Sequence, residues 1–161
     1  MSAAHDWAAI VASSLEWEQS HVKFDHALKG LKPLQRGKRA KGFPHSVWQL
    51  VEHIRLAQAD LLDFCANPKY EHNLKWPDDY WPRNPAPSTG RAWTKSLSDY
   101  HRDLKAFAQL TTGHADTLTE KIPWGTGQTC ARTVLVAMDH ASYHLGQIVA
   151  VRQAIGAWSQ K

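Results

Sequence analysis

Two histidines near the end of the chain have the spacing of metal ligands on a helix. His140 and His144 lie four residues apart in the string DHASYHLGQIV, so their rings point to one side of a helix, about 40° apart. The same spacing holds zinc in metalloproteases, where the glutamate of H-E-x-x-H acts as the base. Ala141 and Ser142 follow the first histidine here, which excludes a metalloprotease. The pair alone is also compatible with two ordinary, half-exposed histidines.

A third histidine strengthens the metal interpretation. His140 and His144 border the apolar stripe of their helix, and His53, in WQLVEHIRLAQ, borders the stripe of an earlier helix. Facing helices of a bundle bring such side chains together. Each buried polar group without a partner costs about 1–3 kcal/mol, and a shared metal ion satisfies several ring nitrogens at once. Three histidines with a coordination position left free are typical of a catalytic divalent-metal site.

Two longer strings around these histidines resemble a known family. HSVWQLVEHIRLAQADLLDFC and MDHASYHLGQIVAVR, with the order of helices and the overall length, are similar to the DinB-like superfamily, also described as YfiT-like metal-dependent hydrolases. The resemblance covers essentially the whole chain. It implies a four-helix bundle in which His53, His140 and His144 bind a divalent ion, zinc or nickel. It also implies a homodimer and, from characterised members of the wider family, the use of bacterial low-molecular-weight thiols.

Several other polar residues are weaker candidates for the same site. Gln147 lies about 20° from His140 around the helix, which places it to hydrogen-bond a ligand or a substrate, or to be an ordinary edge residue. Glu18, His21 and Asp25 share the side of the first helix that we expect to face inward. We consider these three as general bases or as hydrogen-bond partners of the ligands, with a local polar network as the alternative.

Five further residues receive structural or surface roles. Glu52 and Asp139 adjoin predicted ligands, but one residue turns a helix by about 100°, so both are expected to face solvent. Gly146 is expected to permit a close helix contact, and Cys65 lies on an apolar stripe and is expected in the core. Cys130 opens the last helix, where the helix N-terminus lowers a thiol pKa, but we do not expect it to be reactive.

Neutral ligands leave the full charge of the ion on the site, which favours two reactions. A divalent ion lowers the pKa of bound water to about 7 and polarises carbonyl oxygens, and it would also convert a bound thiol into a thiolate. Hydrolysis benefits from a nearby carboxylate, whereas thiol transfer does not need one. We therefore predict a thiol S-transferase or a hydrolase acting on a small molecule. A metal-binding stress protein without turnover is the alternative.

A basic stretch between Lys29 and Lys41 suggests a third function class. Its cations meet no acidic residue: they are Lys29, Lys32, Arg36, Lys38, Arg39 and Lys41. Such a run can bind an anionic substrate or nucleic acid, but a solvated loop is the simpler interpretation, and the formal net charge is only +4. Nucleic-acid binding is therefore the least favoured of the three functions.

Apolar residues recur at helical spacing in four segments. We predict helices over residues 3–29, 46–67, 88–112 and 130–155. Ser46 and Thr129 are suited to cap the second and fourth helices, and Gly30, Gly113 and Gly156 to end three of them. On the first helix, Trp7, Ile10 and Val11 are expected on the apolar side. Exposed tryptophans at positions 7, 17 or 158 are candidates for the dimer surface.

The segment between the second and third helices is long and unusual in composition. Residues 68–87 contain five prolines and four Trp or Tyr residues, so we expect a lid or flap that packs onto the helices. The predicted fold class is all-α, a four-helix bundle with this aromatic and proline-rich loop between helices two and three.

The whole chain has the composition of a globular protein. Its 161 residues are 43% hydrophobic and 21% charged, which excludes disordered and collagen-like chains and suggests a single domain over residues 1–161. No apolar run reaches the ~18 residues that span a membrane, and the start, MSAAHDWAAI, does not look like a signal peptide. Two cysteines are too few for a disulfide framework. We therefore expect a cytoplasmic protein without a membrane partner.

Overall fold

The computed structural model describes residues 2–16, 18 and 20–158, and the fold is all-helical, as the apolar spacing predicts. Among the described residues, β pairing is limited to an isolated antiparallel bridge between Lys121 and Thr129. In chain order the elements are α1 (Ala3–Ser14), α2 (Phe24–Leu28), α3 (Pro33–Arg36), α4 (Val47–Ala66), the 3-10 helix η1 (Asp78–Tyr80), α5 (Gly90–Gly113) and α6 (Cys130–Ala154).

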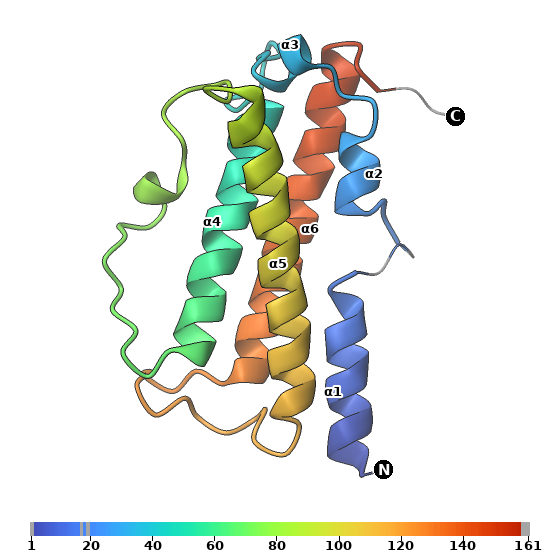
Figure 1. Ribbon diagram of the computed structural model, residues 1–161. Coiled ribbons are helices and arrows are strands. Elements are labelled where there is room, and N and C mark those ends of the chain that lie inside the picture. Colours follow the sequence, from blue (N-terminus) through green and yellow to red (C-terminus); the bar gives the residue numbers. More distant parts are fainter. Residues whose placement is uncertain (1, 17, 19, 159–161) are drawn as a thin grey trace.

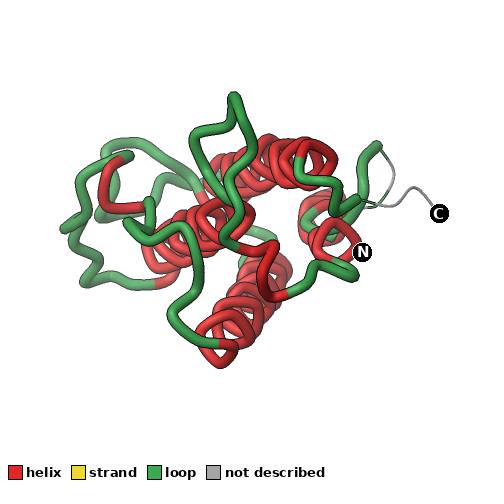
Figure 2. The backbone as a smooth tube through the Cα atoms, turned by 90° about the horizontal axis from the view of Figure 1, so that it is seen from above, coloured by secondary structure: helices red, strands yellow, loops and turns green. Residues whose placement is uncertain are grey.

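The long helices form a bundle. α4, α5 and α6 run side by side, and α1 with α2 takes the fourth position (Figure 1). α4 contacts both α5 and α6, α1 lies mainly against α5, and α2 lies against α6. Seen from above, the helices surround a shared interior and the long connections lie outside it (Figure 2). The largest core cluster includes Leu50, Ile54, Tyr100, Leu104 and Ile148, which come from the three long helices.

α4 begins and ends where its sequence predicts. The hydroxyl oxygen of Ser46 accepts a hydrogen bond from the backbone N–H of Gln49, and the Gln49 side chain accepts one from the backbone N–H of Ser46. This reciprocal pair satisfies two donors of the first turn. At the other end, Asn67 adopts an extended conformation, as expected of a residue before proline. The helix that carries His53 is therefore fixed at both ends by local chemistry.

The last two helices are also close to their predicted limits. α5 starts at Gly90, two residues later than predicted, because Thr89 supplies the cap by accepting from the backbone N–H of Ala92. Thr129 caps α6 as predicted, by accepting from the backbone N–H of Arg132. Gly156 follows α6 with a φ of 69°, a left-handed conformation that glycine adopts without strain.

The prediction of one continuous helix over residues 3–29 is wrong. α1 ends at Ser14 and α2 begins only at Phe24. The hydroxyls of Ser13 and Ser14 donate to the carbonyls of Ile10 and Val11, a local bond that competes with helix continuation and weakens the helix end.

The predicted inward side of α1 is right for Val11 but wrong for Trp7 and Ile10. The Trp7 side chain is 63% exposed and that of Ile10 47%, while Ala8, Val11 and Ala12 are buried. Apolar spacing alone did not distinguish these small residues from the larger ones beside them. Trp158 is half-buried and lies next to the Arg152 guanidinium, and Trp17 lies outside the described residues.

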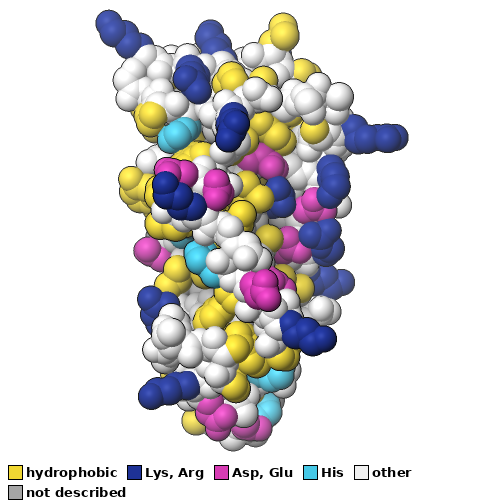
Figure 3. Space-filling model, turned by 90° about the vertical axis from the view of Figure 1, so that its left-hand side faces the viewer, with side chains coloured by type: hydrophobic (Ala, Val, Ile, Leu, Met, Phe, Trp, Pro, Cys, Tyr) yellow, Lys and Arg dark blue, Asp and Glu magenta, His cyan; other side chains and the backbone are white. Residues whose placement is uncertain are grey.

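The basic stretch lies at one end of the bundle. α3 lies at the upper end of the molecule in Figure 1. On the face shown in Figure 3, Lys and Arg side chains are spread over the whole height, and several of them lie at that end. Arg36 packs over the Trp93 ring and Arg39 donates to the side chain of Gln49. Two cations of the stretch therefore have structural contacts. No helix in the described part of the chain combines the length and the apolar character needed to cross a membrane.

Candidate metal site

The bundle brings the three predicted histidines together. α4 carries His53, and α6 carries His140 and His144 one turn apart. The Nε2 atoms of His53 and His140 are 3.0 Å apart, and one ring nitrogen from each of the three residues lies within 4.8 Å of the others. His53 is 2% exposed, His144 is also buried, and His140 is half-buried. Within the described residues, this group contains no acidic side chain and no cysteine.

The hydrogen-bond partner of His53 sets which of its nitrogens is free. Its Nδ1–H donates to the backbone carbonyl of Tyr80, at 3.1 Å. The Nε2 lone pair is therefore left to face His140 and His144. The Tyr80 hydroxyl in turn donates to Oδ2 of Asp60, at 2.7 Å. Asp60 thus ties residues 78–80 to α4 and holds the carbonyl that orients His53.

His144 has an equivalent partner on its own helix. Its Nδ1–H donates to Oε1 of Gln147, at 2.8 Å, which leaves its Nε2 free. The structure therefore places Gln147 next to a predicted ligand. Metal-binding histidines usually donate their second ring N–H to such an acceptor.

These nitrogens fit a divalent ion. Two ligands about 2.1 Å from a tetrahedral ion lie about 3.4 Å apart, within the range from 3.0 Å up to 4.8 Å that the three rings span. Because Nδ1 of His53 and of His144 is already a donor, both remaining nitrogens are acceptors that a cation can use.

Burial keeps the three rings uncharged. Loss of hydration lowers the pKa of His53 to about 4, with the neighbouring His140 and His144 acting in the same direction and the Tyr80 carbonyl opposing them. Burial and His144 lower the pKa of His140 to about 4. Burial also lowers the pKa of His144. The rings are therefore neutral at pH 7, the form in which imidazole binds a metal.

Aromatic rings from residues 68–87 cover the histidines. The Trp81 ring stacks on His53 at a centroid distance of 3.7 Å and on His45 at 3.7 Å, so it is held between two imidazoles. Trp76 lies 5.8 Å from the His53 ring and 5.9 Å from the His140 ring. The loop packs onto the helices, as its composition predicts, and it removes water from one side of the histidine group.

The other predicted polar candidates lie elsewhere. Glu18 accepts from His26 at 2.8 Å, Asp25 contacts His101 at 2.9 Å, and His21 contacts the Ser142 hydroxyl at 3.1 Å. All three candidates are exposed, so the prediction that they face the interior is wrong. The reason is the break after α1, which moves Glu18, His21 and Asp25 off the helical path that the prediction assumed.

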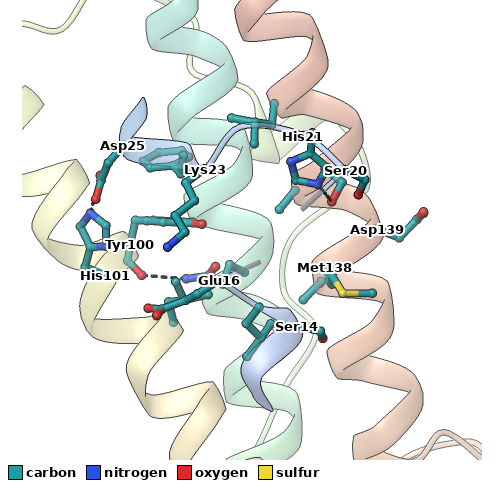
Figure 4. A pocket seen from close by; sticks show the side chains of 18 residues that line it. Ser14, Glu16, Ser20, His21, Lys23, Asp25, Tyr100, His101, Met138 and Asp139 are labelled. Atoms are coloured by element: carbon teal, nitrogen blue, oxygen red, sulfur yellow. Dashed lines mark hydrogen bonds and ion pairs between the residues drawn. The ribbon is translucent and has the colours of Figure 1, made fainter. Parts of the chain in front are cut away.

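Two of these residues border a separate cavity. It has a volume of about 550 Å³ and lies beside the break between α1 and α2. Figure 4 shows His21 and Asp25 on its wall, with Asp25 bonded to His101. From α6 this cavity is lined by Met138 and Ser142. Both positions are two residues, or about 200°, from His140, so the cavity lies on another side of α6.

For two acidic residues on α4 the sequence prediction is wrong or was not made. Glu52 does not face solvent freely: its side chain is 14% exposed and forms a two-bond ion pair with Arg55. Asp60 was missed, although it lies seven residues after His53 and so shares its face of the helix. This seven-residue spacing could have indicated that Asp60 lies near the site. Asp139 is exposed, as predicted.

A comparison with known families places the chain among related proteins. The sequence model of the DinB superfamily matches residues 16–148, a range that contains all three histidines. Neither the curated proteins nor the solved structures contain a match. The family match covers most of the chain and agrees with the helical fold. The chain therefore belongs to the DinB superfamily.

Proposed function

We propose that this protein is a divalent-metal-dependent enzyme that transfers a thiol to a small electrophilic molecule, with zinc or nickel held by His53, His140 and His144. The main support is the group of three neutral imidazoles, with ring nitrogens within 4.8 Å of one another, at the boundary between α4 and α6. When bound, a divalent cation supplies Lewis acidity, which lowers the pKa of a thiol or water that it coordinates.

The residues of the chain contribute orientation and exclusion of water. The Tyr80 carbonyl and the Gln147 amide oxygen fix two of the rings. Trp81, stacked on His53, shields that ring from solvent. In the transfer, the thiol sulfur forms a bond to an electrophilic carbon, the leaving group departs with the electron pair of the broken bond, and the thiol proton passes to solvent.

The surroundings favour thiol transfer over hydrolysis. A hydrolase benefits from a carboxylate that moves protons to and from the attacking water. In the described structure, Asp60 is an acid close to His140, but each of its carboxylate oxygens already accepts a hydrogen bond, one from Tyr70 and one from Tyr80. Asp60 is therefore a positioning residue rather than a free base.

Assays on metal-loaded and metal-free protein test this proposal. Thiols such as cysteine and glutathione are offered with an electrophile such as 1-chloro-2,4-dinitrobenzene, and esters and amides are offered separately. We expect thioether formation by the loaded protein only, its loss in His140→Ala, and its retention in the exposed control His21→Ala. Ester or amide hydrolysis without thiol transfer would assign the hydrolase function instead. Stoichiometric metal without turnover in either assay would favour a metal-binding protein that is not an enzyme.

A further inference from the structure

A small cavity adjoins His140 and is distinct from the larger cavity at the α1–α2 break. Its volume is about 260 Å³, near the lower end of the range for small-molecule sites, which is roughly 300–1,000 Å³. We call it the Trp76 pocket. It is lined by Ala57, Asp60 and Leu61 of α4, Val136 and His140 of α6, and His72, Trp76 and Tyr80 of the loop that covers the histidines.

The helical walls of the Trp76 pocket are mostly apolar. Ala57, Leu61 and Val136 contribute alkyl groups. Trp76 and Val136 are exposed, although both have large apolar side chains and both border the pocket. Exposed apolar surface around a concave site is a common mark of ligand binding. An apolar group of a ligand placed here would cover these two side chains.

The polar atoms of the wall are already used within the protein. The Tyr70 hydroxyl donates to Oδ1 of Asp60 at 3.0 Å, and the Tyr80 hydroxyl donates to Oδ2 at 2.7 Å. Burial and the Asp60 carboxylate raise the pKa of both tyrosines, so the hydroxyls remain donors. Nδ1 of His72 is also paired, with the Tyr70 hydroxyl at 2.9 Å. The two tyrosine hydroxyls cover the Asp60 oxygens, and the remaining pocket wall is almost entirely apolar, so a cation finds little polar surface there. The carboxylate also disfavours an anion.

We propose that the Trp76 pocket binds the apolar part of an uncharged substrate, a single aromatic ring or a short alkyl chain, attached directly to the centre that reacts at the three histidines. This inference rests on the proposed function, because His140 is both a wall of the pocket and a metal ligand in that proposal. The pocket volume of about 260 Å³ suits a compact apolar group. The substrate is the apolar partner of the thiol, not the thiol itself.

A quantitative consequence follows for a homologous series of ligands. Each buried methylene strengthens binding by about fourfold. The dissociation constants of linear 1-alkanols should therefore fall by about that factor per carbon while the chain lies within the pocket, and then level off for carbons that extend into solvent.

Fluorine NMR with a small aromatic probe tests the proposal. 4-Fluorobenzyl alcohol is titrated with metal-loaded protein, and 1-alkanols from ethanol to octanol are used as competitors. Val136→Phe fills the pocket from α6, while Leu135→Phe changes the adjacent residue, which is 47% exposed against 38% for Val136 and does not line the pocket. Trp76→Ala, a loop variant with an exposed side chain, removes an aromatic wall if Val136→Phe does not fold. Metal content is measured on every sample.

We expect Val136→Phe to weaken probe binding by about tenfold or more, the scale of a misfit in an apolar pocket, and Trp76→Ala to weaken it as well. Leu135→Phe should bind like the unmodified protein, and all three variants should keep their metal. Absence of probe binding by metal-loaded protein, or equal binding by Val136→Phe and Leu135→Phe, would overturn the pocket and leave the metal proposal standing. Probe binding by a protein that takes up no metal would support the pocket and contradict the metal proposal.

Discussion

At the scale of single residues, the histidine group depends on two acceptors outside it. His53 is oriented by the Tyr80 carbonyl and His144 by the Gln147 amide. Both bonds occupy Nδ1 and leave Nε2 free, so the nitrogens that face one another are ready to bind a cation. Desolvation also favours cation binding, because it lowers the pKa of His53 and His140 and so keeps both rings in the neutral form.

Replacing Gln147 should weaken metal binding without removing a ligand. In Gln147→Leu the His144 ring loses the acceptor of its Nδ1–H and its fixed orientation, and loss of such a partner typically costs 10–100-fold in metal affinity, so a decrease of about that size is expected. Competition with a chromogenic chelator measures the dissociation constant. Gln153→Leu, an exposed glutamine on the same helix, is the matched control. Equal affinities for the two variants would show that Gln147 does not support the site.

The two cysteines should differ in reactivity. The neighbouring Cys65 thiol lowers the pKa of Cys130, while burial opposes the shift. The proximity of the two sulfurs, together with burial, raises the pKa of Cys65. Alkylation by iodoacetamide should thus occur first at Cys130, with a midpoint below the ordinary thiol pKa of about 8.5.

Mass spectrometry of alkylated peptides over a pH series provides the measurement for the cysteines. Cys65→Ala removes the neighbouring thiol, so the midpoint of Cys130 alkylation should move upward, toward the ordinary value of about 8.5. A midpoint that is near 8.5 already in the unmodified protein contradicts the interaction between the two sulfurs. Only the position of Cys130 at a helix start could be predicted from the sequence, because its proximity to Cys65 depends on the packing of α4 against α6.

At the scale of elements, capping residues and apolar periodicity were sufficient for the three long helices. Ser46, Thr89 and Thr129 act through bonds within one turn, so local sequence contains the information. The end of α1 also has a local cause, in the hydroxyls of Ser13 and Ser14, but serine side chains occur in many uninterrupted helices. For that reason the break, and the displacement of Glu18, His21 and Asp25 that follows from it, could not be predicted.

The histidine ligand set could be predicted in part, because local spacing along a helix determines which side chains share a face. His140 and His144 share a helix face by spacing alone, and His53 required only that α4 packs against α6. The position of the Tyr80 carbonyl and the stacking of Trp81 on His53 depend on the path of residues 68–87. The sequence of this loop has no apolar periodicity from which its path could be predicted. Aromatic and proline content indicated that the loop packs, but not which residue meets which histidine.

Substitution of Gly146 tests the packing and stability of α6. It lies in the middle of α6 and is exposed, and a Cβ added there meets nothing within 4 Å. The expectation that it permits a close helix contact is therefore wrong. Gly146→Ala should raise the free energy of unfolding by about 0.5–1 kcal/mol, because alanine loses less backbone entropy in a helix. Urea denaturation of metal-free protein measures this change, and a lower stability would indicate a contact at this position that the fold does not contain.

At the scale of the whole molecule, the three histidines connect two helices that lie far apart in the sequence. A bound ion would link α4 to α6 across the interior of the bundle, and a ligand that binds only the folded chain stabilises it. At 100 times its dissociation constant, such an ion adds about 2.7 kcal/mol to the free energy of unfolding. For a chain of this size, that corresponds to a rise in Tm of about 5–11 °C.

Calorimetry of protein with and without added zinc or nickel checks this prediction. The increase in Tm should grow with the logarithm of the free metal concentration and should disappear in His53→Ala. An equal increase in His53→Ala would mean that the ion binds elsewhere on the protein.

The most direct measurement is the metal content of the purified protein by elemental analysis after dialysis against metal-free buffer. The account predicts one zinc or nickel ion per chain in the unmodified protein and in His21→Ala, whose side chain is exposed and bonded to Ser142. It predicts a loss of nearly all metal in His53→Ala. A His53→Ala protein that keeps one ion per chain would contradict the three-histidine site.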